Sequence, residues 1–140
     1  MRRLVAAFVA VLAVSAALAG VALAAEAIVG TQKADTLEGT RAGEEIRGLG
    51  GDDTVRGRPG GDVLRGNKGE DRLVGGPGRD RFFGGAGDDS IDARDGEKDG
   101  TIDCGSGRDT VRTDGREPTF DCEREVAEPI IVPTPGEVAP

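Results

Sequence analysis

A nine-residue repeat fills the middle of the chain and limits its possible folds more than any other feature. From Gly30 the sequence divides without a gap into seven rows of nine residues, which end at Asp92. Three positions keep their character in every row. The first is glycine, the sixth acidic and the eighth apolar. The glycines are Gly30, Gly39, Gly48, Gly57, Gly66, Gly75 and Gly84. The acids are Asp35, Glu44, Asp53, Asp62, Asp71, Asp80 and Asp89. The apolar residues are Leu37, Ile46, Val55, Leu64, Leu73, Phe82 and Ile91. This pattern predicts a repeat architecture in which neighbouring rows stabilise each other.

Each constant position has a physical role in such a fold. Glycine permits the positive φ of a sharp bend. The last three positions alternate polar, apolar and polar, which is typical of a short strand with one inward side chain. A row then makes half a turn of a flattened coil, with six residues of loop and three of strand. Stacked rows would pair their strands in parallel and align the eighth-position side chains in an internal ladder.

Apolar burial alone is too small to hold such a chain together. The sequence has 24 glycines, four phenylalanines and neither tryptophan nor tyrosine. One aliphatic side chain per row, at about 25 cal/mol per Å², does not offset about 1–2 kcal/mol of entropy per ordered residue. Aligned carboxylates would also repel each other. Cations between the loops would add stabilising contacts and would also neutralise the repulsion between the carboxylates. Calcium, which takes 6–8 oxygen ligands in flexible geometry, suits carboxylates and backbone carbonyls better than magnesium does.

The rows resemble the RTX, or haemolysin-type, calcium-binding nonapeptide G-G-x-G-x-D-x-U-x. The resemblance is close over residues 30–92 and loose over residues 93–112. It implies an all-β fold, a parallel β-roll (a β-solenoid of short strands) with two nonapeptides per coil. It also implies Ca²⁺ between the loops of rows n and n+2, bound by the sixth-position carboxylates and loop carbonyls.

Carried onto this sequence, the resemblance gives five candidate metal sites. The carboxylate pairs are Asp35–Asp53, Glu44–Asp62, Asp53–Asp71, Asp62–Asp80 and Asp71–Asp89. The fourth-position glycines of the same loops are also candidate metal-site residues: Gly51, Gly60, Gly69, Gly78 and Gly87. The first two rows have Lys33 and Ala42 at that position. The last three pairs are therefore the strongest candidates.

The first residues have the form of a secretory signal peptide. Two arginines precede an apolar run, and Ala22-Leu23-Ala24 fits a cleavage site. We expect residues 1–24 to be removed and the protein to be extracellular, with residues 25–29 leading into the rows. The alternative is an uncleaved membrane anchor, because the run is about long enough to span a bilayer. After cleavage no integral membrane span is expected.

The regular rows give way to a different C-terminal part. Residues 93–103 form an eleven-residue row eight, and residues 104–112 restore the pattern as row nine, with Cys104 in the first position. We expect residues 93–124 to form an irregular capping coil. In an oxidising compartment Cys104 and Cys122 would form a disulfide, the alternative being two free thiols. The acids of row eight (Asp95, Asp99 and Asp103) either supply a last ion or are solvated, and solvation is favoured. Residues 125–140 are expected to be a proline-rich flexible tail.

These features favour a binding protein over an enzyme. The chain has no histidine, which excludes the common catalytic triads. Its net charge of −8 makes nucleic acid an unsuitable partner. The predicted function is a secreted calcium-binding β-roll module that folds on binding calcium. The alternative is a cell-surface or extracellular polymer-binding module. That module would bind an anionic polymer through outward arginines: Arg47, Arg56, Arg65, Arg72 and Arg81.

Overall fold

The computed structural model describes residues 27–115, 117–122 and 124–127, and this part of the chain is all-β. The predicted signal peptide and residues 128–140 lie outside the described residues. The described residues form twelve strands: β1 (Ile28–Val29), β2 (Thr36–Glu38), β3 (Glu45–Gly50), β4 (Thr54–Arg56), β5 (Val63–Lys68), β6 (Arg72–Val74), β7 (Arg81–Ala86), β8 (Ser90–Ala93), β9 (Ile102–Ser106), β10 (Thr110–Thr113), β11 (Thr119–Phe120) and β12 (Arg124–Ala127). The described residues include no helix long and apolar enough to cross a bilayer.

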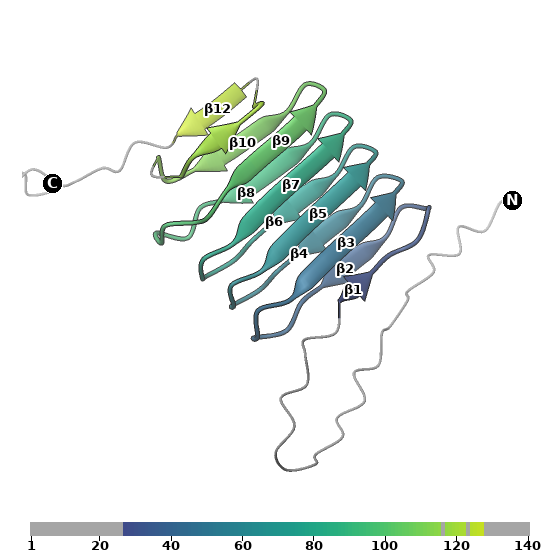
Figure 1. The fold of residues 1–140 in the computed structure, drawn as a ribbon, viewed down its shortest axis with the longest axis horizontal. Coiled ribbons are helices and arrows are strands. Elements are labelled where there is room, and N and C mark those ends of the chain that lie inside the picture. The colour runs from purple at the N-terminus through teal and green to yellow at the C-terminus, as the bar shows by residue number, and fades with distance from the viewer. Residues whose placement is uncertain (1–26, 116, 123, 128–140) are drawn as a thin grey trace, which may run out of the picture.

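The strands alternate between two parallel sheets, which lie face to face (Figure 1). The odd sheet has the order β1-β3-β5-β7-β9-β11, and the even sheet has the order β2-β4-β6-β8-β10-β12. Each strand pairs with the strands two before and two after it in the sequence, so one coil contains two rows. This arrangement confirms the predicted parallel β-roll.

The eighth-position side chains form the predicted ladder between the sheets. In the odd sheet Leu64 lies in register with Ile46 on one side and Phe82 on the other, and all three are fully buried. The even sheet aligns Val55, Leu73 and Ile91 in the same way. Leucine, isoleucine, valine and phenylalanine fit this position because it is the inward one of each short strand.

Strand length differs between the sheets, whereas the repeat predicts three strand residues in every row. The regular strands β3, β5 and β7 of the odd sheet have six residues instead of three. They continue through the third position of the next row. In the even sheet two of the corresponding third positions are Pro59 and Pro77. Proline has no N–H to donate to a strand ladder, so these strands end early.

The solenoid extends beyond the seven regular rows at both ends. β1 lies in the predicted lead-in and pairs with β3. β12 includes residues 125–127, which were expected to belong to the flexible tail, and it pairs with β10 over four residues. The tail boundary is therefore corrected for these residues. Cys104 and Cys122 form a disulfide, with their Cα atoms 5.1 Å apart, so the alternative of free thiols is wrong.

Candidate metal centre

The sixth-position carboxylates line the loops at the two edges of the roll. In rows three to seven they are at most 2% exposed: Asp53, Asp62, Asp71, Asp80 and Asp89. In each of these five the Oδ1 atom accepts a hydrogen bond from the backbone N–H of the sixth residue two rows earlier. The N–H of Asp53, for example, donates to Oδ1 of Asp71 at 2.8 Å. We call each of these two chains of bonds, one per edge, a carboxylate spine.

The second carboxylate oxygen of these five residues has a different environment. Every Oδ2 is buried and has no hydrogen-bond partner. Burial raises the pKa of Asp53 and Asp62 to about 6 and that of Asp80 and Asp89 to about 7, with neighbouring carboxylates adding to the rise. Burial also raises the pKa of Asp71. A buried anionic oxygen without a partner is costly, and a cation beside it would remove that cost.

For four of these five oxygens, those of Asp53, Asp62, Asp71 and Asp89, a backbone carbonyl faces the same space. At Gly57, the first residue of row four, an added Cβ would lie 2.5 Å from Oδ2 of Asp62 and 2.6 Å from the carbonyl oxygen of Gly75. Gly75 is the first residue of row six. The same convergence occurs beside Gly48 and Gly66. Glycine is required here because a side chain would fill the space between the two oxygens.

The first-position glycines, predicted only to allow sharp bends, thus also keep open the space beside the carboxylates. Their presence in all seven rows was the available signal, since the fourth position tolerates Lys33 and Ala42. The fourth-position glycines instead stack closely on one another. At Gly78, where φ is +130°, a Cβ would lie closer than 3.0 Å to the carbonyl oxygen of Gly60. The close stacking brings the loops of rows n and n+2 into contact.

The first two rows satisfy their carboxylates internally. Oδ2 of Asp35 accepts hydrogen bonds from the backbone N–H and the hydroxyl of Thr31, at 2.5 and 2.8 Å. Oε2 of Glu44 accepts one from the N–H of Thr40 at 3.2 Å, and the Thr40 hydroxyl donates to Oε1. Both threonines occupy the second position. In the pairs Asp35–Asp53 and Glu44–Asp62, one carboxylate therefore already has hydrogen bonds to both of its oxygens or to the oxygen that lacks a partner elsewhere. In the other three pairs both carboxylates have an unpartnered Oδ2.

The carboxylate spines continue past the regular rows. Oδ1 of Asp99 accepts the N–H of Asp80 at 2.9 Å, and Oδ1 of Asp109 accepts the N–H of Asp89 at 2.8 Å. Asp99 is 1% exposed, so the favoured interpretation of the row-eight acids as solvated is wrong for this residue. Burial raises its pKa to about 7. The eleven-residue row thus keeps a buried acid at the sixth-position place.

Carboxylates alone do not complete a metal site. Within the described part of the chain, no three cysteine, aspartate or glutamate side chains gather closely enough to hold an ion. A cation here would need carbonyl oxygens as well, and such carbonyls face the Oδ2 atoms of Asp53, Asp62, Asp71 and Asp89. Mixed carboxylate and carbonyl coordination is typical of calcium.

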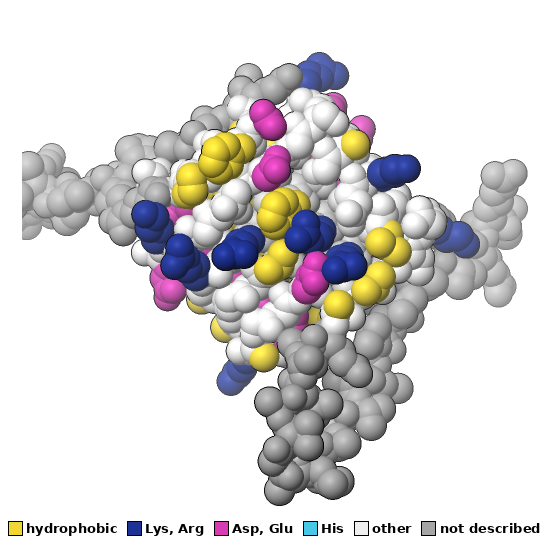
Figure 2. Space-filling view, in the orientation of Figure 1, with side chains coloured by type: hydrophobic (Ala, Val, Ile, Leu, Met, Phe, Trp, Pro, Cys, Tyr) yellow, Lys and Arg dark blue, Asp and Glu magenta, His cyan; other side chains and the backbone are white. Residues whose placement is uncertain are grey.

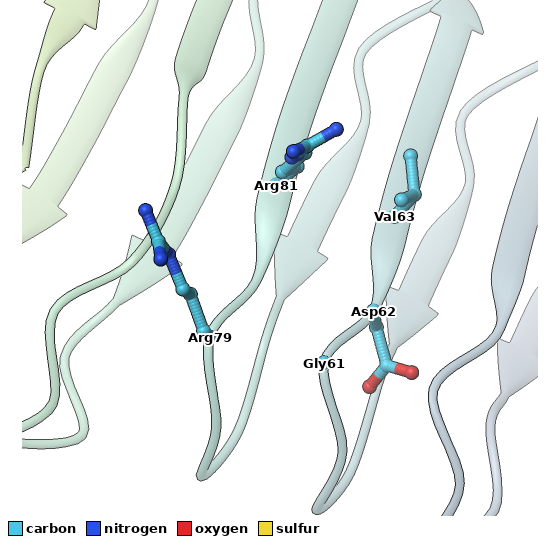
Figure 3. A pocket seen from close by; sticks show the side chains of 5 residues that line it. All are labelled: Gly61, Asp62, Val63, Arg79 and Arg81. Carbon is cyan, nitrogen blue, oxygen red and sulfur yellow. The ribbon is translucent and has the colours of Figure 1, made fainter.

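Basic side chains border two surface pockets at one edge of the roll. The first, of about 300 Å³, is lined by Gly61, Asp62, Val63, Arg79 and Arg81. Figure 3 shows the two arginines on the chain segment next to the Gly61–Asp62 loop. The second, of about 200 Å³, shares both arginines and adds Lys98 and Asp99.

The outward arginines predicted from the strands are largely paired with acids. Arg47 and Arg65 contact Glu45 at 2.8 and 3.0 Å. Arg56 lies 3.5 Å from Glu38. Arg65 also lies over the ring of Phe83, 4.2 Å from its centroid. Figure 2 shows basic, acidic and hydrophobic side chains interspersed on one face of the roll.

Comparison with known proteins identifies the repeat. The model of the RTX calcium-binding nonapeptide repeat (4 copies) matches residues 29–64, 38–73 and 65–97. Searches of curated proteins and of solved structures found no match. RTX nonapeptide repeats are calcium-binding motifs, and the matched residues include the loops with buried, unpartnered carboxylate oxygens. Together with the two-sheet parallel solenoid, this match shows that the chain is an RTX-type β-roll repeat protein.

Proposed function

We propose that the protein is a secreted calcium-binding module that folds into its roll when calcium ions bind between rows n and n+2. The proposed ligands are the sixth-position carboxylates and the carbonyls of the stacked loops. The three pairs formed by rows three to seven are the principal sites: Asp53–Asp71, Asp62–Asp80 and Asp71–Asp89. The module acts by binding calcium and not by catalysis. Its calcium-bound roll is the functional state.

One observation carries this proposal, the set of five buried Oδ2 atoms without a hydrogen-bond partner. A protein core does not leave five such oxygens unpaired unless something compensates them. The carbonyl oxygens beside Gly48, Gly57 and Gly66 face the same spaces. Calcium–oxygen coordination would replace the missing hydrogen bonds and neutralise the like charges along each spine.

A calcium titration followed by circular dichroism tests the folding step. The calcium-free protein should gain β-sheet signal as calcium reaches about 0.1–1 mM, the range of extracellular calcium modules. Magnesium at equal concentration is the control and should give a much smaller gain, because it demands stricter octahedral geometry. A β-sheet signal that does not respond to calcium would contradict the proposal.

Secretion rests on the sequence of residues 1–24 and has its own test. Mass spectrometry of the exported protein should give an N-terminus at Ala25. A protein that keeps its first residues and sediments with membranes would instead support the anchor. These outcomes do not depend on calcium binding.

A second candidate function is binding of an anionic polymer at the edge that carries Arg79, Arg81 and Lys98. Among the described residues these three form no ion pair. Arg79 and Arg81 border both surface pockets, and Lys98 borders the second. In calcium buffer, the double variant Arg79→Gln/Arg81→Gln should elute from a polyanion column at lower salt. The variant Arg72→Gln/Arg112→Gln removes the same charge from the even sheet and is the control. If both variants elute at the same salt concentration, the weaker binding reflects net charge alone, which would contradict a specific polymer site.

A further inference from the structure

The oxygen convergence found between regular rows recurs once between a regular row and a later one, at Gly84, where row seven meets row nine. A Cβ added at Gly84 would lie 2.5 Å from Oδ2 of Asp89 and closer still to the carbonyl oxygen of Cys104. Cys104 occupies the first position of row nine, where the regular rows have glycine. A backbone carbonyl does not depend on the side chain, so cysteine can supply the same oxygen.

The other elements of the regular site are present at the same place. Asp89 is 2% exposed, and its Oδ2 is one of the buried oxygens without a hydrogen-bond partner. Asp109, 1% exposed, receives the N–H of Asp89 on its Oδ1 at 2.8 Å. Gly107 stacks on Gly87 as the fourth-position glycines of the regular rows do.

Row eight provides a contrast within the same structure. At Gly75 the three nearest atoms to an added Cβ belong to Asp80 and Phe82, and none belongs to row eight. The two extra residues of row eight follow Ala93, the residue at its first position. The convergence is therefore not a general property of stacked rows. It is restored at row nine, where the nine-residue spacing returns.

We propose that rows seven and nine hold an additional calcium site, formed by Asp89, Asp109 and the carbonyl oxygen of Cys104. This inference rests on the proposed function and extends it past residue 97, where the family match ends. The disulfide to Cys122 ties the ligating backbone of Cys104 to the last coil. Occupation of the site and attachment of the cap are thus linked, and each stabilises the other.

Counting bound calcium by equilibrium dialysis tests the site. We compare the wild-type protein with Asp109→Asn, which keeps an oxygen to accept the Asp89 N–H and removes the charge. Asp103→Asn is the control, because it removes a charge from the outer face of β9. Asp71→Asn reports on the regular sites. We expect one calcium ion fewer in Asp109→Asn, none fewer in Asp103→Asn, and at least one fewer in Asp71→Asn.

The outcomes separate this site from the proposed function. An unchanged count in Asp109→Asn, with a reduced count in Asp71→Asn, would overturn the additional site and leave the proposed function intact. A wild-type protein that binds no calcium would overturn both. Circular dichroism in calcium shows whether each variant keeps its β-sheet content.

The link to the disulfide has a separate test that does not depend on one substitution. The variant Cys104→Ser/Cys122→Ser keeps the carbonyl but does not fix its position. At subsaturating calcium it should bind less than the wild type. Adding Asp109→Asn to it should cause a smaller further loss than Asp109→Asn causes in the wild type, because both changes act on the same ion. Fully additive losses would show two independent effects and overturn the link.

Discussion

Acidification should restore structure to the calcium-free protein. The pKa of Asp80 rises from 3.8 to about 7 in the folded roll, chiefly because the carboxyl is buried. The pKa of Asp89 rises to about 7 for the same reason. Between pH 4 and pH 7 the folded state therefore binds more protons than the unfolded state. Stability from these groups is fully present below about pH 3.8 and is lost as pH rises through 7.

The size of the effect follows from the shifts. One pKa unit corresponds to about 1.36 kcal/mol, so the full shift of Asp80 is worth about 4 kcal/mol. Even at buried sites the effective dielectric constant of a protein is about 20, which reduces this to about 1–2 kcal/mol per carboxylate. Four carboxylates have a pKa raised to about 6 or 7: Asp53, Asp62, Asp80 and Asp89. Together they contribute a large part of the whole stability of a small domain, which is about 5–15 kcal/mol. The calcium-free protein should be largely unfolded at pH 8 and recover much of its structure at pH 5.

Far-UV circular dichroism of protein freed of calcium, at pH 8 and at pH 5, measures this directly. The variant Asp80→Asn sharpens the result. It keeps an oxygen for the N–H of Asp62 and removes the charge. Without calcium it should be more stable than the wild type at pH 8, yet bind calcium more weakly. Equal β-sheet signal at the two pH values, or a less stable calcium-free Asp80→Asn, would refute the electrostatic reasoning.

Three stability predictions can be checked by thermal unfolding in calcium. Leu49 has a φ of +83°, so Leu49→Gly should stabilise the roll by about 1 kcal/mol. Thr40→Gly, at the same position of a row without positive φ, should destabilise it. Gly78→Ala should destabilise strongly, because its Cβ collides with the loop two rows earlier, whereas Gly61→Ala meets its nearest atom at 3.2 Å and should have a smaller effect. Leu64→Ala should cost about 2–5 kcal/mol through the cavity that it leaves in the ladder. A change below about 1 kcal/mol would show that the ladder repacks.

The repeat made the ladder and the stacking direction predictable from sequence. A constant apolar eighth position admits one geometry, in which Leu64 lies between the equivalent residues two rows before and after. The unequal strand lengths were harder to predict from sequence, because they depend on which edge of the roll contains Pro59 and Pro77. These prolines can be assigned to an edge only once it is known that one coil contains two rows.

The residues of the candidate site were predicted from sequence, but the roles of their individual atoms were not. Spacing alone placed Asp71 between Asp53 and Asp89. It could not show that one oxygen of each carboxylate binds the backbone while the other is left unpartnered. Asp99 was misjudged because the extra residues of row eight break the nine-residue count. The extra residues lie before and after Asp99, so the side chain of Asp99 is still buried where a sixth-position acid would be.

The carboxylate spines also give the roll a direction. In every bond of a spine the N–H belongs to the earlier row and the accepting carboxylate to the later one. An early row is therefore incomplete until the chain two rows downstream exists. A chain that lacks its C-terminal rows would leave the N–H groups of the preceding coil without their carboxylate acceptors. The C-terminal rows are the ones that complete the structure.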